Sequence, residues 1–352
     1  MGARHLVVRA GARATDRLRA EGFHPDRFDT LVGASGGPKW LVLRHLDEVL
    51  IERLILARTT PLDTLGSSIG SFRHACFAQK DPSAAIARFL ERYIAQAYEG
   101  RPTMEAISQE SGRILAHTLG EHGSNEIVGN DLVRSHFVAS RLRRDRGRDR
   151  GLAFQLQLGT AAASNLASRS WLERFFTRVL FGPERAEIGF GDFATKHVAL
   201  SPDNLPHALL ASGSIPLVME GVRSTPDLPG MLFDGGIIDY HFDFTFRRRK
   251  GLVLFSHFFD RITPGWFDKP LPWRRPALAD LSDVVMLAPS DSFVAGLPGG
   301  RVPDRNDFLE LDTKARIRRW QTVVEHCRAL ADEFDDLLSG GRLADAIEPF
   351  RA

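Results

Sequence analysis

The chain has 352 residues, of which 43% are hydrophobic and 26% are charged, which is enough apolar material for a sizeable core. Lys and Arg total 46 while Asp and Glu total 44, so the formal net charge of +2 gives no reason to expect nucleic acid as a partner. The two cysteines provide neither a disulfide framework nor a metal-ligand cluster, so we expect no metal, no cofactor and a reducing cytoplasm. No apolar stretch approaches the ~18–20 residues of a membrane span.

The beginning of the chain predicts alternating strands and helices. Residues 5–9 and 28–32 predict two strands, and residues 14–21 predict a short helix between them. Residues 38–56 place their apolar side chains near one face of a helix. A strand, a helix, a strand and a long helix in this order are typical of an α/β fold with a parallel sheet.

Between the second strand and the long helix lies Gly-Ala-Ser-Gly-Gly, residues 33–37, which fits the pattern G-x-S-x-G. A serine on a sharp glycine-bounded turn between a strand and a helix is typical of a nucleophile elbow, so Ser35 is a candidate nucleophile. Gly33, Gly36 and Gly37 would relieve the crowding of such a turn, and N–H groups at the helix start would face an oxyanion. The alternatives are an ordinary turn and a phosphate-binding loop.

The middle of the chain predicts further helices and strands, with no internal repeat and no linker. Residues 82–98 and 102–119 have the pattern of amphipathic helices. Residues 137–142 and 152–156 predict two strands. The mixed charge run between them, residues 143–150, predicts an exposed hairpin tip.

The second half predicts the rest of the sheet. Residues 196–200 predict a strand, followed by a helix from residue 202 or 203 to about residue 211. Residues 231–233 predict another strand. Residues 252–256 and 284–287 predict later strands that run parallel to each other.

Residues 305–338 predict helices with an inner apolar stripe that includes Trp320 and Cys327. We therefore expect one α/β domain over residues 1–352. Its core covers residues 5 to about 300, and a helical C-terminal extension covers about 304–352.

Three further segments suit chemistry. Asp234 follows the strand at 231–233, and two glycines after it leave the carboxylate room in a tight turn, so Asp234 is a candidate base. Gly11, directly after the first predicted strand, lets backbone N–H groups approach a ligand, and Arg13 adds positive charge there. Residues 211–216, Ala-Ser-Gly-Ser-Ile-Pro, are a run of small residues at the end of a predicted helix.

The chain resembles the patatin-like phospholipase family over residues 5 to about 240. Four motifs in order carry the resemblance: Gly-x-Arg after a first strand, G-x-S-x-G, Ala-Ser-x-x-Ile-Pro, and Asp-Gly-Gly. The resemblance implies a three-layer α/β/α fold with a mainly parallel central sheet. It also implies a serine acyl hydrolase that cleaves carboxylic esters, above all those of lipids, through an acyl-enzyme.

The same resemblance implies the roles of individual residues. Ser35 would be the nucleophile and Asp234 its base, as a dyad without histidine. The oxyanion hole would comprise Gly11, Ala12, Arg13 and Gly36.

Two other interpretations stay open. His257 stands at the end of a predicted strand and follows Asp234 in the chain, an order that suits a Ser-His-Asp triad. The second is a patatin-like module that binds acyl chains or a protein partner without turnover. It is suggested because the family's run of glycines is reduced here to Gly11, after Arg9 and Ala10.

The chemistry leaves the substrate open among phospholipids, lysophospholipids, neutral esters and thioesters. Residues 265–275 combine tryptophan, lysine and arginine in a Pro-rich loop, which suits a lipid headgroup interface as well as an ordinary surface loop. We therefore expect a cytoplasmic protein, with peripheral contact to a membrane surface as one alternative.

Overall fold

The computed structural model describes residues 4–144, 149–223 and 228–351 of the chain. The strands are β1 (Leu6–Ala10), β2 (Phe28–Gly33), β3 (Leu62–Ser67), β4 (Val133–Leu142), β5 (Phe176–Gly182), β6 (Thr195–Ala199), β7 (Val222–Arg223), β8 (Met231–Asp234), β9 (Leu252–Ser256), β10 (Val284–Pro289) and β11 (Ile347–Pro349). The α-helices are α1 (Ala12–Glu21), α2 (Arg44–Leu50), α3 (Ile69–Phe77), α4 (Pro82–Ile94), α5 (Met104–Leu119), α6 (Gly123–Val128), α7 (Leu152–Ala167), α8 (Leu205–Gly213), α9 (Asp291–Ala295), α10 (Asp307–Glu310), α11 (Thr313–His326) and α12 (Arg328–Ser339). Shorter helical segments used below are η2 (Gly37–Leu43), η3 (Ile51–Ile55), η5 (Gly235–Ile237) and η6 (Trp266–Asp268).

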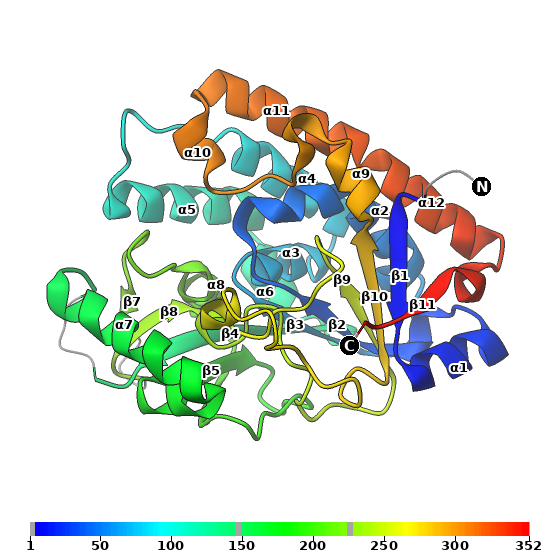
Figure 1. The fold of residues 1–352 in the computed structure, drawn as a ribbon, viewed down its shortest axis with the longest axis horizontal. Helices are drawn as coiled ribbons and strands as arrows, with labels where there is room; N and C mark the ends of the chain where they lie inside the picture. The colour runs from blue at the N-terminus through cyan, green and yellow to red at the C-terminus, as the bar shows by residue number, and fades with distance from the viewer. Residues whose placement is uncertain (1–3, 145–148, 224–227, 352) are drawn as a thin grey trace.

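The described strands form a single sheet with helices on its faces (Figure 1). The order along the sheet is β11-β1-β10-β9-β2-β3-β4-β5-β6, and β8 and β7 extend it beside β4. The strands β10, β9, β2, β3 and β4 are all parallel to their neighbours in this run. Every residue of β2, β3, β9 and β10 is buried, as in parallel sheets that are covered on both faces. The prediction of an α/β fold with a mainly parallel sheet is confirmed.

The first strand lies elsewhere in the sheet than its place in the sequence suggests. β1 does not adjoin β2. It pairs antiparallel with β10, with Leu6 opposite Pro289 and Ala10 opposite Val285. The prediction of a parallel opening is therefore wrong for this strand, because its partner comes from residues almost 280 positions further along the chain. The predicted helix at 38–56 is present as three consecutive segments, η2, α2 and η3.

Residues 152–156 begin helix α7, so the predicted strand and hairpin are wrong. Leu152 and Leu156 are 72% and 61% exposed, whereas Phe154 is buried, and this alternation over five residues imitates a strand. β4 pairs instead with β5, which comes from later in the chain. The predicted hairpin tip at 143–150 lies partly outside the described residues.

The remaining predicted elements are confirmed within a few residues. The helices at 82–98 and 102–119 are α4 and α5, the strand at 196–200 is β6, and the helix after it is α8. The later strands are β8, β9 and β10. The C-terminal helices α11 and α12 run along the top of the molecule (Figure 1) and bury Trp320 and Cys327 completely. They pack against η2 and α2, which follow the second strand, and against α4, which follows the third strand and α3.

Two strands meet end to end beside β4. β3 pairs with residues 133–138 of β4, while β8 pairs antiparallel with residues 139–141. Both use the edge of β4 that faces away from β5, because β5 occupies the other edge at the same residues. The last residue of β3, Ser67, lies opposite Val138, and the last residue of β8, Asp234, lies opposite the next residue, Ala139. The turn after β3 therefore faces the end of β8.

Candidate active site

The turn after β3 carries a second G-x-S-x-G motif, residues 66–70, which the sequence analysis missed. It reads Gly-Ser-Ser-Ile-Gly and joins β3 directly to α3. Its central residue, Ser68, has φ 56° and ψ −126°, a backbone conformation that non-glycine residues rarely adopt. A strained serine on a turn from a strand into a helix has the geometry of a nucleophile elbow.

The glycines of this second motif are required by close packing. A Cβ atom on Gly66 would lie 2.6 Å from the backbone N of Ser71, and one on Gly70 would lie 2.1 Å from the carbonyl oxygen of Gly33. No side chain fits at either position, so the first turn of α3 can approach both its own strand and the end of β2. The Ser68 N–H donates to the Ser212 hydroxyl at 3.0 Å, which fixes the elbow to the end of α8.

Ser68 and Asp234 form a hydrogen-bonded pair across this junction. The Ser68 hydroxyl donates to Asp234 Oδ2 at 2.6 Å, and the Gly236 N–H donates to Asp234 Oδ1 at 2.7 Å. Both side chains are buried and both line one cavity of about 190 Å³. A serine hydroxyl within reach of a carboxylate is the arrangement that general-base activation requires.

Ser35 lies in the same cavity but does not have the geometry predicted for it. Its hydroxyl donates to Ser67 Oγ at 2.9 Å, and its N–H donates to the Tyr240 carbonyl at 2.8 Å. Among the described residues, the non-glycine positions with positive φ include Ser68 but not Ser35. The prediction of a strained elbow at Ser35 is therefore wrong. The residue that donates a hydrogen bond to Asp234 is Ser68.

Burial raises the pKa of Asp234 to about 6, although the hydrogen bonds from Ser68 and Gly236 act in the opposite direction. A carboxylate with this pKa is ionised at neutral pH and is a better proton acceptor than a free aspartate. We expect kcat/KM for an ester to rise about tenfold per pH unit up to about pH 6 and then to level off. The reason is that only the ionised carboxylate can accept the serine proton.

A pH–rate profile on an uncharged ester between about pH 4.5 and pH 8 measures this. Burial lowers the pKa of His257 to about 4, so an essential His257 would place the inflection near that value instead. A flat profile through pH 6 would contradict Asp234 as the base.

The predicted oxyanion residues Gly11, Ala12 and Arg13 lie at the opposite edge of the sheet. β1 is antiparallel to β10. Its last residue therefore lies at the amino-terminal ends of the parallel strands, whereas Ser35 and Ser68 follow their carboxyl-terminal ends. The Gly11 N–H donates to the Val284 carbonyl at 3.0 Å and is not free for a ligand. Arg13 is 61% exposed and pairs with Asp283 at 3.1 Å. The assignment of these three residues to an oxyanion hole is therefore wrong.

The loop that carries the first motif provides donors at the cavity instead. Gly36 and Gly37 line the cavity, and among the described residues nothing accepts a hydrogen bond from either N–H group. The Ile69 N–H, next after Ser68 and at the start of α3, is also without an acceptor in this part of the chain. An N–H directly after the nucleophile, joined by N–H groups from a second loop, is the usual composition of an oxyanion hole.

We expect Gly36→Ala to lower kcat by about 10²-fold, because a Cβ there would lie 2.4 Å from Cζ of buried Phe258 and would displace the loop. The matched control is Gly159→Ala in α7, where an added Cβ meets nothing within 4 Å. Steady-state hydrolysis and thermal unfolding of both variants measure the effect. Full kcat in a folded Gly36→Ala enzyme would exclude this loop as the oxyanion donor.

His257 takes no part in the cavity. Its ring is fully buried, and Nδ1 lies 2.6 Å from the carbonyl oxygen of Phe259. No histidine is found among the described residues that line the cavity around Ser68. The geometry gives the Ser-His-Asp alternative no support.

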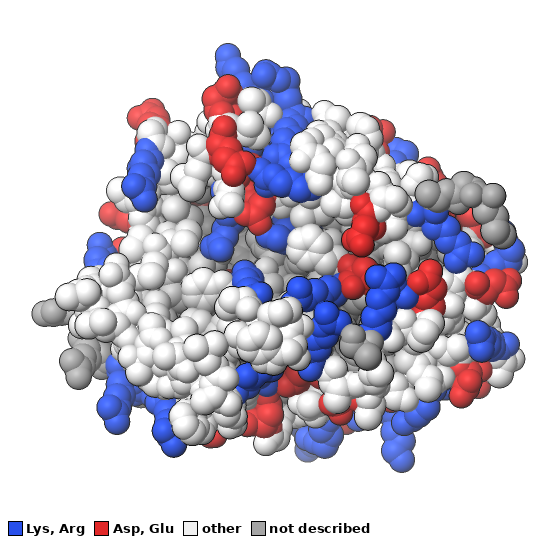
Figure 2. Space-filling model, in the orientation of Figure 1, with Lys and Arg blue, Asp and Glu red and all other residues white. Residues whose placement is uncertain are grey.

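A second, larger cavity of about 470 Å³ adjoins the first. Both cavities share Gly37, Ser68, Ile215 and Arg305 in their walls. The larger one is otherwise lined mainly by apolar side chains from α3, α4, α5, α10 and the segment after α8, among them Phe72, Phe89, Ile107, Ile114, Met219 and Phe308. Its volume falls in the range of small-molecule sites. In the view of Figure 2 the face between these helices is hollowed.

The aromatic and basic loop at 265–275 is partly built into the site. Trp266 and Lys269 line the smaller cavity, and the Lys269 ammonium lies 4.0 Å from the centre of the Tyr240 ring. Trp273 is 70% exposed. Among the described residues, no group of three or more His, Cys, Asp or Glu side chains is arranged to hold a metal, and no helix is long and apolar enough to cross a bilayer.

The molecule is thus a mixed α/β protein whose mainly parallel sheet carries a buried serine–aspartate pair at one edge. In a comparison of folds it is similar to VipD from Legionella pneumophila, with a TM-score of 0.31 and 10% sequence identity. That match covers 73% of this chain and 53% of the VipD chain, so the chain spans about half the length of that protein. No family model matches the sequence, and no curated protein resembles it.

Proposed function

We propose that this protein is a serine acyl hydrolase that cleaves carboxylic esters of lipids, with Ser68 as nucleophile and Asp234 as base. The observation that carries the proposal is the 2.6 Å hydrogen bond from a strained serine to a buried carboxylate in the wall of a cavity. Strain of this kind persists only where the surrounding structure imposes it, and it concentrates at sites of chemistry.

The reaction follows from the geometry. Asp234 accepts the Ser68 proton as the serine oxygen attacks the ester carbonyl. The N–H groups of Gly36, Gly37 and Ile69 then hold the oxyanion of the tetrahedral intermediate. Asp234 returns the proton to the leaving alcohol, and water repeats the sequence on the acyl-enzyme to release the acid.

The larger cavity supports an acyl chain as part of the substrate. It opens beside Ser68, and its apolar walls remove hydrocarbon from water, at about 0.8 kcal/mol for each buried CH₂ group. An acyl chain in this cavity places its ester carbonyl at the serine and leaves the alcohol part in the smaller cavity. A lipid ester fits both spaces.

The order of motifs along the chain supports the patatin-like assignment once the roles of elbow and oxyanion donor are assigned to other segments than the sequence analysis gave them. The elbow is the Gly-Ser-Ser-Ile-Gly turn around Ser68, the glycine loop at 33–37 supplies the N–H donors, and Ser212 in the Ala-Ser-x-x-Ile-Pro segment holds the elbow. Asp234 keeps its place in Asp-Gly-Gly. All of these lie within the stretch that carries the resemblance.

A fluorophosphonate probe tests the proposal, because only an activated serine reacts with it. Trypsin separates the two motifs, since Ser35 falls in the peptide 28–39 and Ser68 in the peptide 59–73. We expect mass spectrometry to find the label on the second peptide and at Ser68. The absence of any label on the folded protein would instead favour a module that binds acyl chains without turnover.

A further inference from the structure

The smaller cavity contains more positive charge than its neighbouring carboxylates balance. Three cationic side chains line it, namely Lys39, Lys269 and Arg305, against two carboxylates, those of Asp234 and Asp304. Lys39 is paired with Asp304. Two cations therefore remain beside the reacting pair, and basic side chains surround the hollow on this face in Figure 2.

Neither of the two remaining cations forms an ion pair with a side chain of the described residues, although the charges of Asp234 and Asp304 act on both. Lys269 contacts only the faces of Tyr240 and Trp266, at 4.0 and 5.9 Å from the ring centres, and forms no ion pair or hydrogen bond there through its ammonium. Arg305 forms no side-chain hydrogen bond or ion pair with that part of the chain either. Unpaired cations at the wall of a cavity are typical of a site that receives an anion.

The charges act on one another. Desolvation, together with the nearby positive charges of Lys39 and Arg305, lowers the pKa of Lys269 to about 8, so this lysine is still mostly charged at neutral pH. The carboxylates of Asp234 and Asp304 act in the opposite direction, but three cations against two carboxylates leave the cavity with an excess of positive charge. The proton transfer to Asp234 moves its negative charge onto the oxyanion, so the net charge of the site is unchanged and the positive excess persists through the reaction.

The positions of the two cations indicate which part of the substrate carries the anion. Arg305 lies in the walls of both cavities, whereas Lys269 lines only the smaller one. With the acyl chain in the larger cavity, the alcohol part of the ester occupies the space between these two residues.

We propose that the alcohol part of the substrate carries a phosphate-type anion without a compensating cation, and that Lys269 and Arg305 select it. This inference rests on the proposed acyl hydrolase function and adds the substrate class to it. A zwitterionic headgroup would bring an ammonium into a space that already has an excess of positive charge, and a neutral alcohol would leave both cations unpaired.

Binding of octyl amphiphiles to the wild-type protein tests this independently of turnover, because none of them contains a carboxylic ester. Calorimetric titration with octyl phosphate, octyl phosphocholine and octyl glucoside should give at least about tenfold tighter binding for octyl phosphate. Inorganic phosphate should bind more weakly than octyl phosphate, because it lacks the chain. Equal affinity for the three amphiphiles, or inorganic phosphate binding as tightly as octyl phosphate, would overturn the inference.

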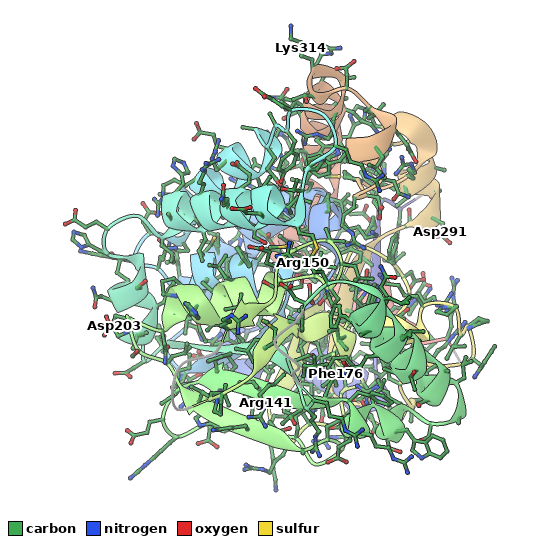
Figure 3. The ribbon with its side chains drawn as sticks, turned by 90° about the vertical axis from the view of Figure 1, so that its left-hand side faces the viewer. Arg141, Arg150, Phe176, Asp203, Asp291 and Lys314 are labelled. Atoms are coloured by element: carbon green, nitrogen blue, oxygen red, sulfur yellow. The ribbon has the colours of Figure 1, made fainter. Side chains whose placement is uncertain are left out.

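Variants then assign the preference to the two residues. Lys269→Gln together with Arg305→Gln should reduce the preference for octyl phosphate to less than about threefold. Lys314→Gln is the control, because it makes the same lysine-to-glutamine change far from the cavity. Lys314 projects from α11 at the top of Figure 3, and this variant should keep the full preference for octyl phosphate. An undiminished preference in the folded double variant would overturn the roles of Lys269 and Arg305.

A hydrolysis series separates this inference from the proposed function. Wild-type protein is assayed on esters of one acyl chain whose alcohols carry a phosphate monoester, phosphocholine or no charge. Hydrolysis of all three at equal kcat/KM would leave the acyl hydrolase intact and overturn the anion selection. A preference for octyl phosphate in binding, with no hydrolysis and no probe label, would overturn the acyl hydrolase and support the anion site.

Discussion

Ser68→Ala is expected to lower ester hydrolysis by about 10⁴-fold or more, because it removes the atom that forms the acyl-enzyme. The fold should persist, since the hydroxyl bonds only Asp234 and the backbone strain of residue 68 is not relieved by alanine. Ser35→Ala removes a hydroxyl that bonds Ser67 in the same cavity, and should cost no more than about tenfold.

This pair of substitutions decides between the two G-x-S-x-G motifs of the chain. Both variants are assayed on a short-chain chromogenic ester, labelled with the fluorophosphonate probe and checked by thermal unfolding. An inactive Ser35→Ala beside an active Ser68→Ala would restore the elbow first predicted from the sequence and contradict the assignment made from the geometry.

Asp234→Asn is expected to lower kcat by about 10³–10⁴-fold and, at the same time, to raise the unfolding temperature. An amide cannot accept the serine proton. It can still bond both neighbours, accepting from the Gly236 N–H and donating to the Ser68 oxygen.

The stability gain follows from the direction of the pKa shift. Folding raises the pKa of Asp234 to about 6, so the buried charge costs roughly 3 kcal/mol above that pH, and this cost disappears as the pH falls below about 4. The gain from Asp234→Asn should accordingly be largest at neutral pH and vanish in acid.

Asp239→Asn, five residues further on, provides the matched control. Burial raises the pKa of Asp239 as well, but here the carboxylate accepts from the buried guanidinium of Arg178 at 2.6 and 2.8 Å. The loss of this ion pair should outweigh the relief of burial and destabilise the fold by about 3 kcal/mol. Opposite changes in unfolding temperature for the two variants would distinguish a functional carboxylate from a structural one. A destabilised but active Asp234→Asn would show that Asp234 is only structural.

Most of the secondary structure could be predicted from local pattern. The strands β9 and β10 are nearly continuous apolar runs, and α4 and α5 have helical periodicity, so each could be found within a few residues. The failure at α7 has a physical cause. Its Leu152 and Leu156 are exposed, so the hydrophobic pattern of the segment does not report which side is buried.

The pairing of strands could not be predicted from the local sequence pattern. β1 reads as an ordinary first strand, and nothing within it shows that it pairs with β10 in the antiparallel direction. The direction of β1 decides whether the turn after it, which carries Gly11, lies at the carboxyl-terminal or the amino-terminal ends of the parallel strands. The transfer of an oxyanion role to Gly11 and Arg13 failed for this reason, although the glycine and arginine match the motif.

The site itself was half predicted. Asp234 and the cavity loop at 33–37 could be found from glycine spacing, but the same pattern occurs again at 66–70 and was passed over. A stricter comparison would have found it, since Leu62 and Leu65 precede the turn at strand length and Ile69 opens a helix. Sequence alone does not rank the two turns, because backbone strain at Ser68 and the end-to-end meeting of β3 and β8 arise only in the assembled sheet.

That meeting of β3 and β8 also bears on how the molecule matures. Ser68 and Asp234 are 166 positions apart, and neither β3 nor β8 contacts the other through a ladder; each is placed by β4. Contacts between such distant segments form slowly, because a long loop must close before they stabilise anything. During synthesis Ser68 leaves the ribosome well before Asp234, so the chain carries the proposed nucleophile for a time without its proposed base.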